Sequence, residues 1–238
     1  MGIRRGSIST PIIADGLVFN MDPANRASYI PDATTSFNTI DLSSSGNLTN
    51  GVNFLQPPIS SSCWDFDGTD DYIKFPSAAN VVPLNDITVS VWQYLVGRDS
   101  TAMMASNGSG GNEFLIYNGY SGLIDNKIAA VFDNSALSTW LTSSIVPNLN
   151  EWLNITVTRD SNTVSLYLDG QLNVQKTQTT TLNFGSAPLF IGVDVDSGNE
   201  GSLGNYFEGN IGCIQMYNRT LSSTAVLHTY NALKLRFE

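Results

Sequence analysis

Carboxylates are the side chains of this chain best suited to catalysis, but their spacing does not form a catalytic pair. Retaining glycoside hydrolysis needs two carboxyl groups roughly 5 Å apart, and on a β-strand such groups stand at alternate residues. No glutamate has a second carboxylate two residues away; the glutamates are Glu113, Glu151, Glu200, Glu208 and Glu238. The nearest arrangements are Asp65-x-Asp67, Asp70-Asp71 and Asp194-x-Asp196. We therefore predict that the protein is not an enzyme.

The first two arrangements are expected to be structural. Asp67-Gly68 favours a turn, because glycine adopts the positive φ that many turns require. Asp70 or Asp71 is expected to accept backbone N–H hydrogen bonds within that loop.

Nucleophilic catalysis is also disfavoured. His228 is the only histidine, and no Gly-x-Ser-x-Gly motif is present. The glycine-rich segment 108–111 lacks the lysine and helix that follow a phosphate-binding loop. We expect His228 to be a surface or packing residue.

Calcium is the one cofactor that the acidic residues could hold. The segment 194–200 reads DVDSGNE, which combines carboxylates with a glycine, as a site of oxygen ligands requires. Its predicted ligands are Asp194, Asp196 and Glu200. Asp70 and Asp71 form a second candidate site. The alternative is that both are acidic surface loops that bind no ion.

Aromatic rings exposed beside polar groups would suit a carbohydrate. The candidate platforms are Trp92, Tyr94, Tyr117, Tyr120 and Trp140, with Tyr206 also available. Trp92 alternates with Val89 and Val91, which predicts that it faces away from the core. The competing interpretation is that these rings are core or edge residues, as most tryptophans in sandwiches are.

Charge and hydropathy exclude two classes of partner. A formal net charge of −10 argues against nucleic acid, because phosphate binding needs clustered lysine and arginine. No apolar run approaches the roughly 20 residues of a membrane span. Residues 1–7 lack the apolar core of a signal peptide, so we expect synthesis and folding in a cytoplasm.

Strand patterns recur along the chain with turn residues between them, at the spacing of roughly 8–12 residues that is typical of a β-sandwich. The predicted strands are 16–21, 62–67, 71–75, 87–96, 101–106, 113–117, 127–133, 137–143, 152–159, 163–169, 181–184, 188–193 and 207–217. The clearest hairpin spans 153–169, with apolar and polar residues alternating on both sides of a turn at 160–162. The segment 23–60 is expected to be a long connection with one or two short strands.

One short helix is predicted over 222–233, near the end of the chain. Ser222 is its expected N-cap, and Val226, Leu227, Tyr230 and Leu233 share one apolar face. Residues 15–238 are therefore predicted to form a single domain, preceded by an arm at 1–14.

The arm carries apolar and basic residues without an obvious role in the core: Ile3, Arg4, Arg5, Ile8, Ile12 and Ile13. Apolar residues in a mobile arm favour docking on a partner, for example as a strand added to a sheet edge. The alternative is that the arm folds back on its own sandwich as an extra edge strand.

Cys63 and Cys213 lie far apart in the sequence, each within a predicted strand. Two cysteines are too few for a metal site. Two buried thiols and a disulfide both remain open.

Four segments resemble, in order, motifs of the laminin-G-like branch of the concanavalin A-like lectin/glucanase superfamily. Residues 16–22 read GLVFNMD, and 64–73 read WDFDGTDDYI. Residues 151–170 begin with EW and end with LYLDG, and 210–237 contain YNRTLS and YNALKLRF. The resemblance covers nearly the whole chain and implies an all-β, two-sheet antiparallel jelly roll with one short C-terminal helix. It also implies that calcium, where bound, lies at the rim and that Cys63 and Cys213 lie in the same region of the sandwich.

This variant of the motifs resembles single-domain proteins of tailed phages. It implies a non-enzymatic virion protein, either a head decoration or a tail or baseplate appendage. Its partners would be other virion proteins, copies of itself and host-surface polysaccharide. The alternatives are a carbohydrate-binding lectin or adhesin and, third, a glycoside hydrolase.

Overall fold

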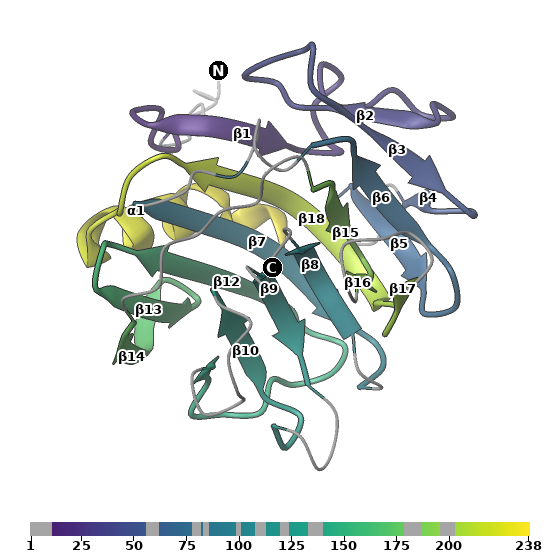
Figure 1. Cartoon of the computed structure of the whole chain (residues 1–238). Coiled ribbons are helices and arrows are strands. Elements are labelled where there is room, and N and C mark those ends of the chain that lie inside the picture. The colour runs from purple at the N-terminus through teal and green to yellow at the C-terminus, as the bar shows by residue number, and fades with distance from the viewer. Residues whose placement is uncertain are drawn as a thin grey trace, which may run out of the picture.

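The structure is a computed structural model that describes residues 11–55, 62–77, 82, 86–98, 101–107, 113–119, 124–132, 140–178, 187–195 and 203–238. Two antiparallel sheets pack face to face (Figure 1). We call them sheet A and sheet B. The predicted all-β jelly roll with one short C-terminal helix is confirmed.

Sheet A contains the first and the last strand of the described chain. Its strands, in spatial order, are β14 (Gln171–Thr177), β13 (Thr163–Leu168), β12 (Trp152–Arg159), β7 (Ile87–Leu95), β18 (Glu208–Tyr217), β5 (Cys63–Asp67) and β4 (Asn53–Leu55), and β1 (Leu17–Met21) also pairs with β18. The predicted hairpin is β12–β13, in which Ile155 pairs with Leu168. Its turn forms because Asp160 Oδ1 accepts the N–H groups of Asn162 and Thr163.

Sheet B covers the other side of the core. Its order is β11 (Leu141–Thr142), β10 (Ile128–Val131), β9 (Glu113–Asn118), β8 (Thr101–Asn107), β15 (Leu189–Ile191), β6 (Tyr72–Phe75), β3 (Ser45–Thr49) and β2 (Thr35–Phe37). A two-stranded ribbon of β16 (Asp194–Val195) and β17 (Leu203–Gly204) lies beside it.

Some strand predictions were incomplete. The described part of the segment 23–60 contains three short strands, β2, β3 and β4, and β14 was not among the predicted strands. β14 is an edge strand whose residues are exposed or half-buried, so it carries no apolar pattern. The predicted strand at 181–184 lies outside the described residues.

Because successive side chains of a strand point to opposite faces, every second side chain of each sheet faces the core. Ile87, Val89 and Val91 of β7 contribute from sheet A, and Phe114 and Ile116 of β9 contribute from sheet B. All are at most 1% exposed, so the two sheets share one dry interior.

One polar pair crosses this interior. Gln93 Nε2 donates to Asn118 Oδ1 at 3.2 Å, and Asn118 Nδ2 donates to Gln93 Oε1 at 2.9 Å. Because β7 and β9 belong to different sheets, these reciprocal bonds hold the sheets at one relative position.

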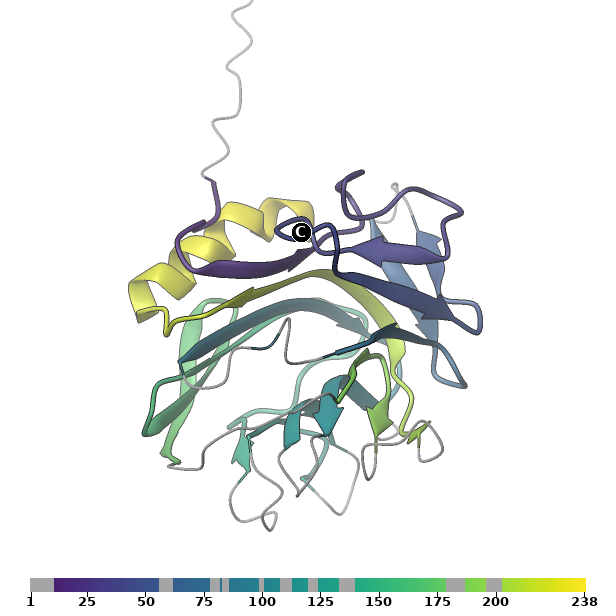
Figure 2. The same ribbon diagram turned by 45° about the horizontal axis from the view of Figure 1, so that its top comes forward.

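The helix α1 (Ser223–Leu233) and the following 3-10 turn η3 (Lys234–Arg236) lie on the outer face of sheet A (Figure 2). Ser222 is the N-cap, as predicted, and its side chain accepts from the Ala225 N–H. Trp92 faces away from the core, also as predicted, but it is only 3% exposed. Its ring stacks on Tyr230 at 5.5 Å and on Phe237 at 4.3 Å, so it anchors the C-terminal segment.

The described part of the predicted arm lies against the domain. Ile13 packs on the cluster of Tyr217, Leu221 and Val226, and His228 Nε2 donates to the Pro11 carbonyl at 3.0 Å. Ile13 therefore has a packing role that was not evident from the sequence. Ile12 is half-buried, whereas Ile3, Arg4, Arg5 and Ile8 lie outside the described residues.

Both cysteines are buried free thiols. Of the two alternatives that the sequence left open, the structure therefore has the two thiols and not the disulfide. Burial, with a smaller effect of the nearby Asp65 carboxylate, raises the pKa of Cys63 to about 12. Burial also raises the pKa of Cys213 far above its ordinary value. Neither thiol ionises at neutral pH in the native state, and thiol reactivity depends on the thiolate.

We expect Trp92→Ala to reduce the free energy of unfolding by about 3–5 kcal/mol, since it removes the ring on which Tyr230 and Phe237 stack. Tyr94→Ala is the matched control, because Tyr94 is the next outward-facing aromatic residue of β7 and is half-exposed. Urea unfolding followed by fluorescence measures both. Equal and small losses would show that Trp92 does not anchor the helix.

We expect both thiols to resist a thiol reagent such as DTNB in the native protein and to react fully in denaturant. A reductant should leave the melting temperature unchanged, because no disulfide is present to reduce. Rapid native labelling of either cysteine would contradict the burial described above.

Candidate functional site

The turn between β5 and β6 carries three aspartates and joins sheet A to sheet B. Asp67 Oδ1 accepts the N–H groups of Thr69 at 2.8 Å and Asp70 at 3.4 Å. Asp71 Oδ2 accepts the Asp67 N–H at 3.1 Å, so the predicted bonding of Asp70 or Asp71 to the backbone is made by Asp71. Gly68 has φ of 75°, which completes the turn.

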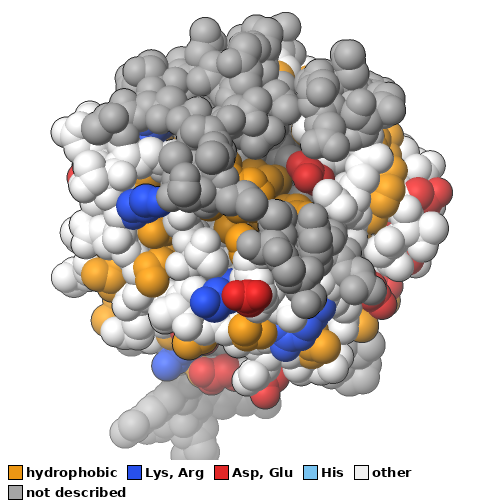
Figure 3. All heavy atoms as spheres, turned by 60° about the horizontal axis from the view of Figure 1, so that its bottom comes forward, with side chains coloured by type: hydrophobic (Ala, Val, Ile, Leu, Met, Phe, Trp, Pro, Cys, Tyr) orange, Lys and Arg blue, Asp and Glu red, His pale blue; other side chains and the backbone are white. Residues whose placement is uncertain are grey.

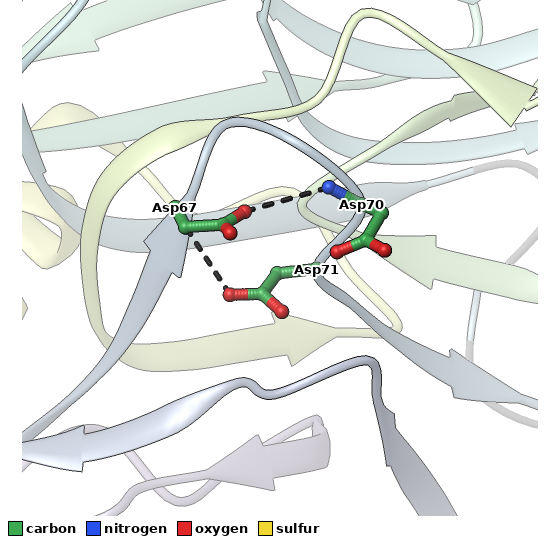
Figure 4. Close-up of side chains that lie close together, drawn as sticks. All are labelled: Asp67, Asp70 and Asp71. Carbon is green, nitrogen blue, oxygen red and sulfur yellow. Dashed lines mark hydrogen bonds between the residues drawn. The ribbon is translucent and has the colours of Figure 1, made fainter.

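The three carboxylates of this turn gather at one point (Figure 4). One oxygen from each of Asp67, Asp70 and Asp71 lies within 4.8 Å of the others. Burial raises the pKa of Asp71, and the charges of Asp67, Asp70 and Asp65 add to this effect, while the hydrogen bond from the Asp67 N–H opposes it. We call this group of three the acidic turn.

The other predicted calcium site is only partly described. Asp194 Oδ1 accepts the Val195 N–H at 2.9 Å, and Oδ2 accepts from Asn205 Nδ2 at 3.2 Å. The carboxylate of Asp194 is thus held by protein donors. Asp196 and Glu200 lie outside the described residues.

Aromatic side chains gather on the outer face of sheet B. In β6, Ile73 and Phe75 face the core, so Tyr72 and Lys74 face outward. A second hydrophobic cluster forms there from Leu115, Tyr117, Ile124, Ala129, Val131, Phe190, Val193 and Val195. Tyr72, Trp140, Leu203 and Tyr206 pack against this cluster and are half-buried.

The buried rings of this cluster support the half-exposed ones. Tyr72 packs on Phe190 with ring centroids 5.8 Å apart, and Trp140 packs edge-on against Tyr117 at 6.2 Å. Burial and the nearby Tyr72 and Asp70 raise the pKa of Tyr206, so its hydroxyl stays protonated and able to donate. We call Tyr72, Trp140 and Tyr206 the aromatic face. Figure 3, from the lower side of Figure 1, shows hydrophobic side chains at the surface between the residues drawn in grey.

Polar groups border the aromatic face. Lys74 lies between Asn47 and Phe190 in the register of sheet B. Asn205 is exposed, and its side chain bonds to Asp194. Rings and hydrogen-bonding groups are therefore side by side on this surface.

The residues predicted as platforms for a carbohydrate lie in different parts of the structure. Trp92 is covered by the C-terminal segment, and Tyr117 is 2% exposed, so neither can be an exposed platform. Trp140 lies on the aromatic face, whereas Tyr94 is half-exposed on sheet A, where it packs on Trp152. Tyr120 lies outside the described residues.

Tyr72 was missed because it belongs to the FDGTDDYI motif, which was interpreted as structural. The period-two pattern of Ile73 and Phe75 could have placed it on the outer face, beside Lys74.

Within the described residues, no helix is long and apolar enough to cross a membrane.

A laminin-G-type family model matches residues 67–227, which is most of the chain. The protein therefore belongs to the concanavalin A-like lectin/glucanases superfamily.

Two solved structures show the same fold. Domain 4 of AbnA, an extracellular arabinanase from Geobacillus stearothermophilus solved with arabinotriose, is 16% identical with a TM-score of 0.67, over 90% of this chain and 98% of that domain. Trypanosoma rangeli sialidase, solved with 2,3-difluorosialic acid, is 13% identical with a TM-score of 0.65 over 97% of this chain. The match spans only 37% of the sialidase. No curated protein sequence matches significantly.

Proposed function

We propose that this chain is a non-catalytic carbohydrate-binding domain that contacts its ligand through the aromatic face of sheet B. The observation that carries the proposal is the set of half-exposed rings of Tyr72, Trp140 and Tyr206 on one sheet face, supported from below by buried aromatic residues. Aromatic rings offer an apolar surface for the C–H faces of a sugar, and their polar tips can bond to hydroxyl groups.

The polar border supports a hydroxyl-rich ligand. Lys74 and the Tyr206 hydroxyl can donate, and Asn205 can both donate and accept. A net charge of −10 disfavours acidic polysaccharides, so we propose a neutral glycan. The arabinotriose in the AbnA domain agrees with this choice, although that similarity is one of fold.

The non-catalytic part of the proposal rests on the carboxylates. Asp65 and Asp67 stand at alternate positions of β5, but Asp65 accepts from Asn210 Nδ2 at 2.7 Å and Asp67 holds the turn. Both carboxylates are thus engaged in structural bonds.

Tyr72→Ala and Trp140→Ala should each weaken binding to a neutral glycan by about tenfold or more, since tenfold corresponds to about 1.4 kcal/mol. Tyr94→Ala is the matched control, because Tyr94 is half-exposed on the opposite sheet. A glycan array selects the ligand, and calorimetry then measures the affinities. Loss with Tyr94→Ala alone would place the site on sheet A. Release of reducing sugar that one Asp→Asn change abolishes would contradict a non-catalytic role.

We further propose that the domain serves in a tailed-phage virion, where glycan binding would attach the particle to its host. The sequence resemblance supports this role, with other virion proteins and copies of this chain as partners. The segment 1–10 would provide the docking arm, because Ile13 is already engaged with Tyr217 and Leu221.

Deleting residues 1–10 should abolish incorporation into particles and leave the melting temperature of the isolated domain unchanged. Deleting 1–14 is the control, and it should lower the melting temperature because it also removes Ile13 from its cluster. Quantitative immunoblotting of purified particles measures incorporation. Normal incorporation of the 1–10 deletion would exclude the arm as the docking element.

A further inference from the structure

A cleft lies at the edge of sheet A, beside β4. Its larger lobe has a volume of about 450 Å³, and the residues that line it include Tyr29, Pro31, Asp32, Asn53 and Phe54. A smaller lobe of about 180 Å³ shares Tyr29, Pro31 and Phe54 with the larger one. We call the two lobes together the edge cleft. The larger lobe has the size of an ordinary ligand pocket.

The floor of the edge cleft is aromatic and fixed by the core. Tyr29 is 4% exposed, and its ring centroid lies 5.0 Å from that of Phe54 and 6.3 Å from that of Trp64. Trp64 is fully buried in the main hydrophobic cluster. Phe54 is only half-buried, which leaves apolar surface on the floor for a ligand side chain.

Asp32 is kept at the rim in a backbone conformation that suits glycine better. The Ala33 N–H donates to the Ile30 carbonyl at 3.0 Å, which closes a turn with Pro31 and Asp32 at its centre. Asp32 has φ of 70°, and a turn with positive φ at this position normally takes glycine or asparagine. An exposed carboxylate is thus held at a strained position, as is common at functional sites.

The carboxylate of Asp32 lies near the hydroxyl group of Tyr29. Burial raises the pKa of Tyr29, a backbone hydrogen bond at Asp32 opposes this rise, and the Asp32 charge adds to it. The larger lobe therefore combines an aromatic floor with a negative charge, which together suit a basic side chain.

The strand β4 can pair with a further strand at this cleft. It pairs with β5 on one side, and no strand pairs with its other side in the part of the chain that the structure describes. An open edge presents backbone N–H and C=O groups to which an extended segment can bond. Asn53 of β4 is exposed and lines the cleft, so a segment can reach this edge.

The first ten residues of the chain match the edge cleft in charge and length. Residues 1–10 contain Arg4 and Arg5 and no acidic residue, so residues 11–238 carry a formal charge of −12, against −10 for the whole chain. The described chain begins at Pro11, whose carbonyl is bonded to α1. Ten extended residues reach up to roughly 33 Å, which is enough to cross from there to a neighbouring molecule.

We infer that residues 1–10 of one copy dock in the edge cleft of a neighbouring copy, as a strand added to β4 with an arginine paired to Asp32. Arg26 lines only the smaller lobe, so the larger lobe is the one that favours a basic side chain. The inference rests on the docking arm of the proposed function and names the surface that receives it. It does not rest on the glycan site.

The test is sedimentation equilibrium of the purified full chain at increasing concentration. The chain should associate, and added salt should weaken the association because it screens the paired charges. A synthetic peptide of residues 1–10 should compete, and the same peptide with Arg4→Ser and Arg5→Ser should not. A chain that stays monomeric up to about 100 μM, or two peptides that behave alike, would overturn the inference.

Asp32→Gly separates docking from a structural role. Glycine accepts positive φ without strain, so the melting temperature should equal or exceed that of the wild type. The dissociation constant for self-association should nevertheless rise at least about tenfold, because a charge-assisted bond is lost. Asp32→Asn should weaken association to a similar extent, since asparagine tolerates this backbone conformation but carries no charge.

Asp125→Gly is the matched control. Asp125 is also exposed and has φ of 53°, but it lies in the turn between β9 and β10. Its replacement should change the melting temperature in the same direction as Asp32→Gly and leave self-association unchanged. An unchanged dissociation constant in both Asp32 variants, or an equal loss in Asp125→Gly, would exclude the edge cleft as the receiving surface.

These measurements separate the inference from the proposed function. None of them involves sugar, so a failure of glycan binding leaves their result standing. If the purified chain does not associate although deletion of residues 1–10 still abolishes incorporation into particles, the arm docks on another virion protein, and the inference alone is lost.

Discussion

Strand β18 is the element on which the rest of the structure depends, because it pairs with three strands from distant parts of the chain. It lies beside β7 along most of its length, beside β5 at its beginning and beside β1 at its end. The pairing of β18 with β7 has a register shift between Ile211 and Ile214, which separates the part of β18 that pairs with β5 from the part that pairs with β1. Gly212 stands at this shift, where a Cβ atom would lie 2.5 Å from the Phe237 ring. Gly212 therefore lies both at the register shift of β18 and against Phe237 of the C-terminal segment.

This arrangement gives the two outer faces different roles. The outer face of sheet A is polar where Ser90, Asn154 and Thr156 bond to one another, and all three are buried. Mutual hydrogen bonds satisfy these groups without water. Sheet B has its own outer cluster, on which Tyr72, Trp140 and Tyr206 are half-buried rather than fully covered. The C-terminal segment thus covers Trp92 on sheet A, whereas Tyr72, Trp140 and Tyr206 on sheet B are not fully covered.

Features set by neighbouring residues could be predicted from the sequence, whereas features set by contacts between distant residues could not. The β12–β13 hairpin and the Ser222 cap were predictable, since local alternation and capping chemistry determine them. The direction of Trp92 was predictable from its alternation with Val91, but its burial was not, because Tyr230 and Phe237 reach it only through the fold. Tyr72 was overlooked for a related reason. The motif that builds a turn at Asp67 also contains Tyr72, the first residue of β6. Only the alternation of Ile73 and Phe75 in the sequence indicates that Tyr72 has a second role.

The acidic turn and the aromatic face meet where the chain passes from one sheet to the other. A polypeptide that leaves sheet A at Asp67 and enters sheet B at Tyr72 has four residues in which to reverse, and Asp67 and Asp71 bond to the backbone to make this possible. Close packing of the turn then brings their carboxylates together, so the same tight geometry that joins the sheets concentrates negative charge beside the rings. Burial raises the pKa of Tyr206, and the nearby charge of Asp70 adds to this effect. Hydroxyl groups can donate to carboxylates, which is the chemistry that the proposed neutral glycan would bring to this junction.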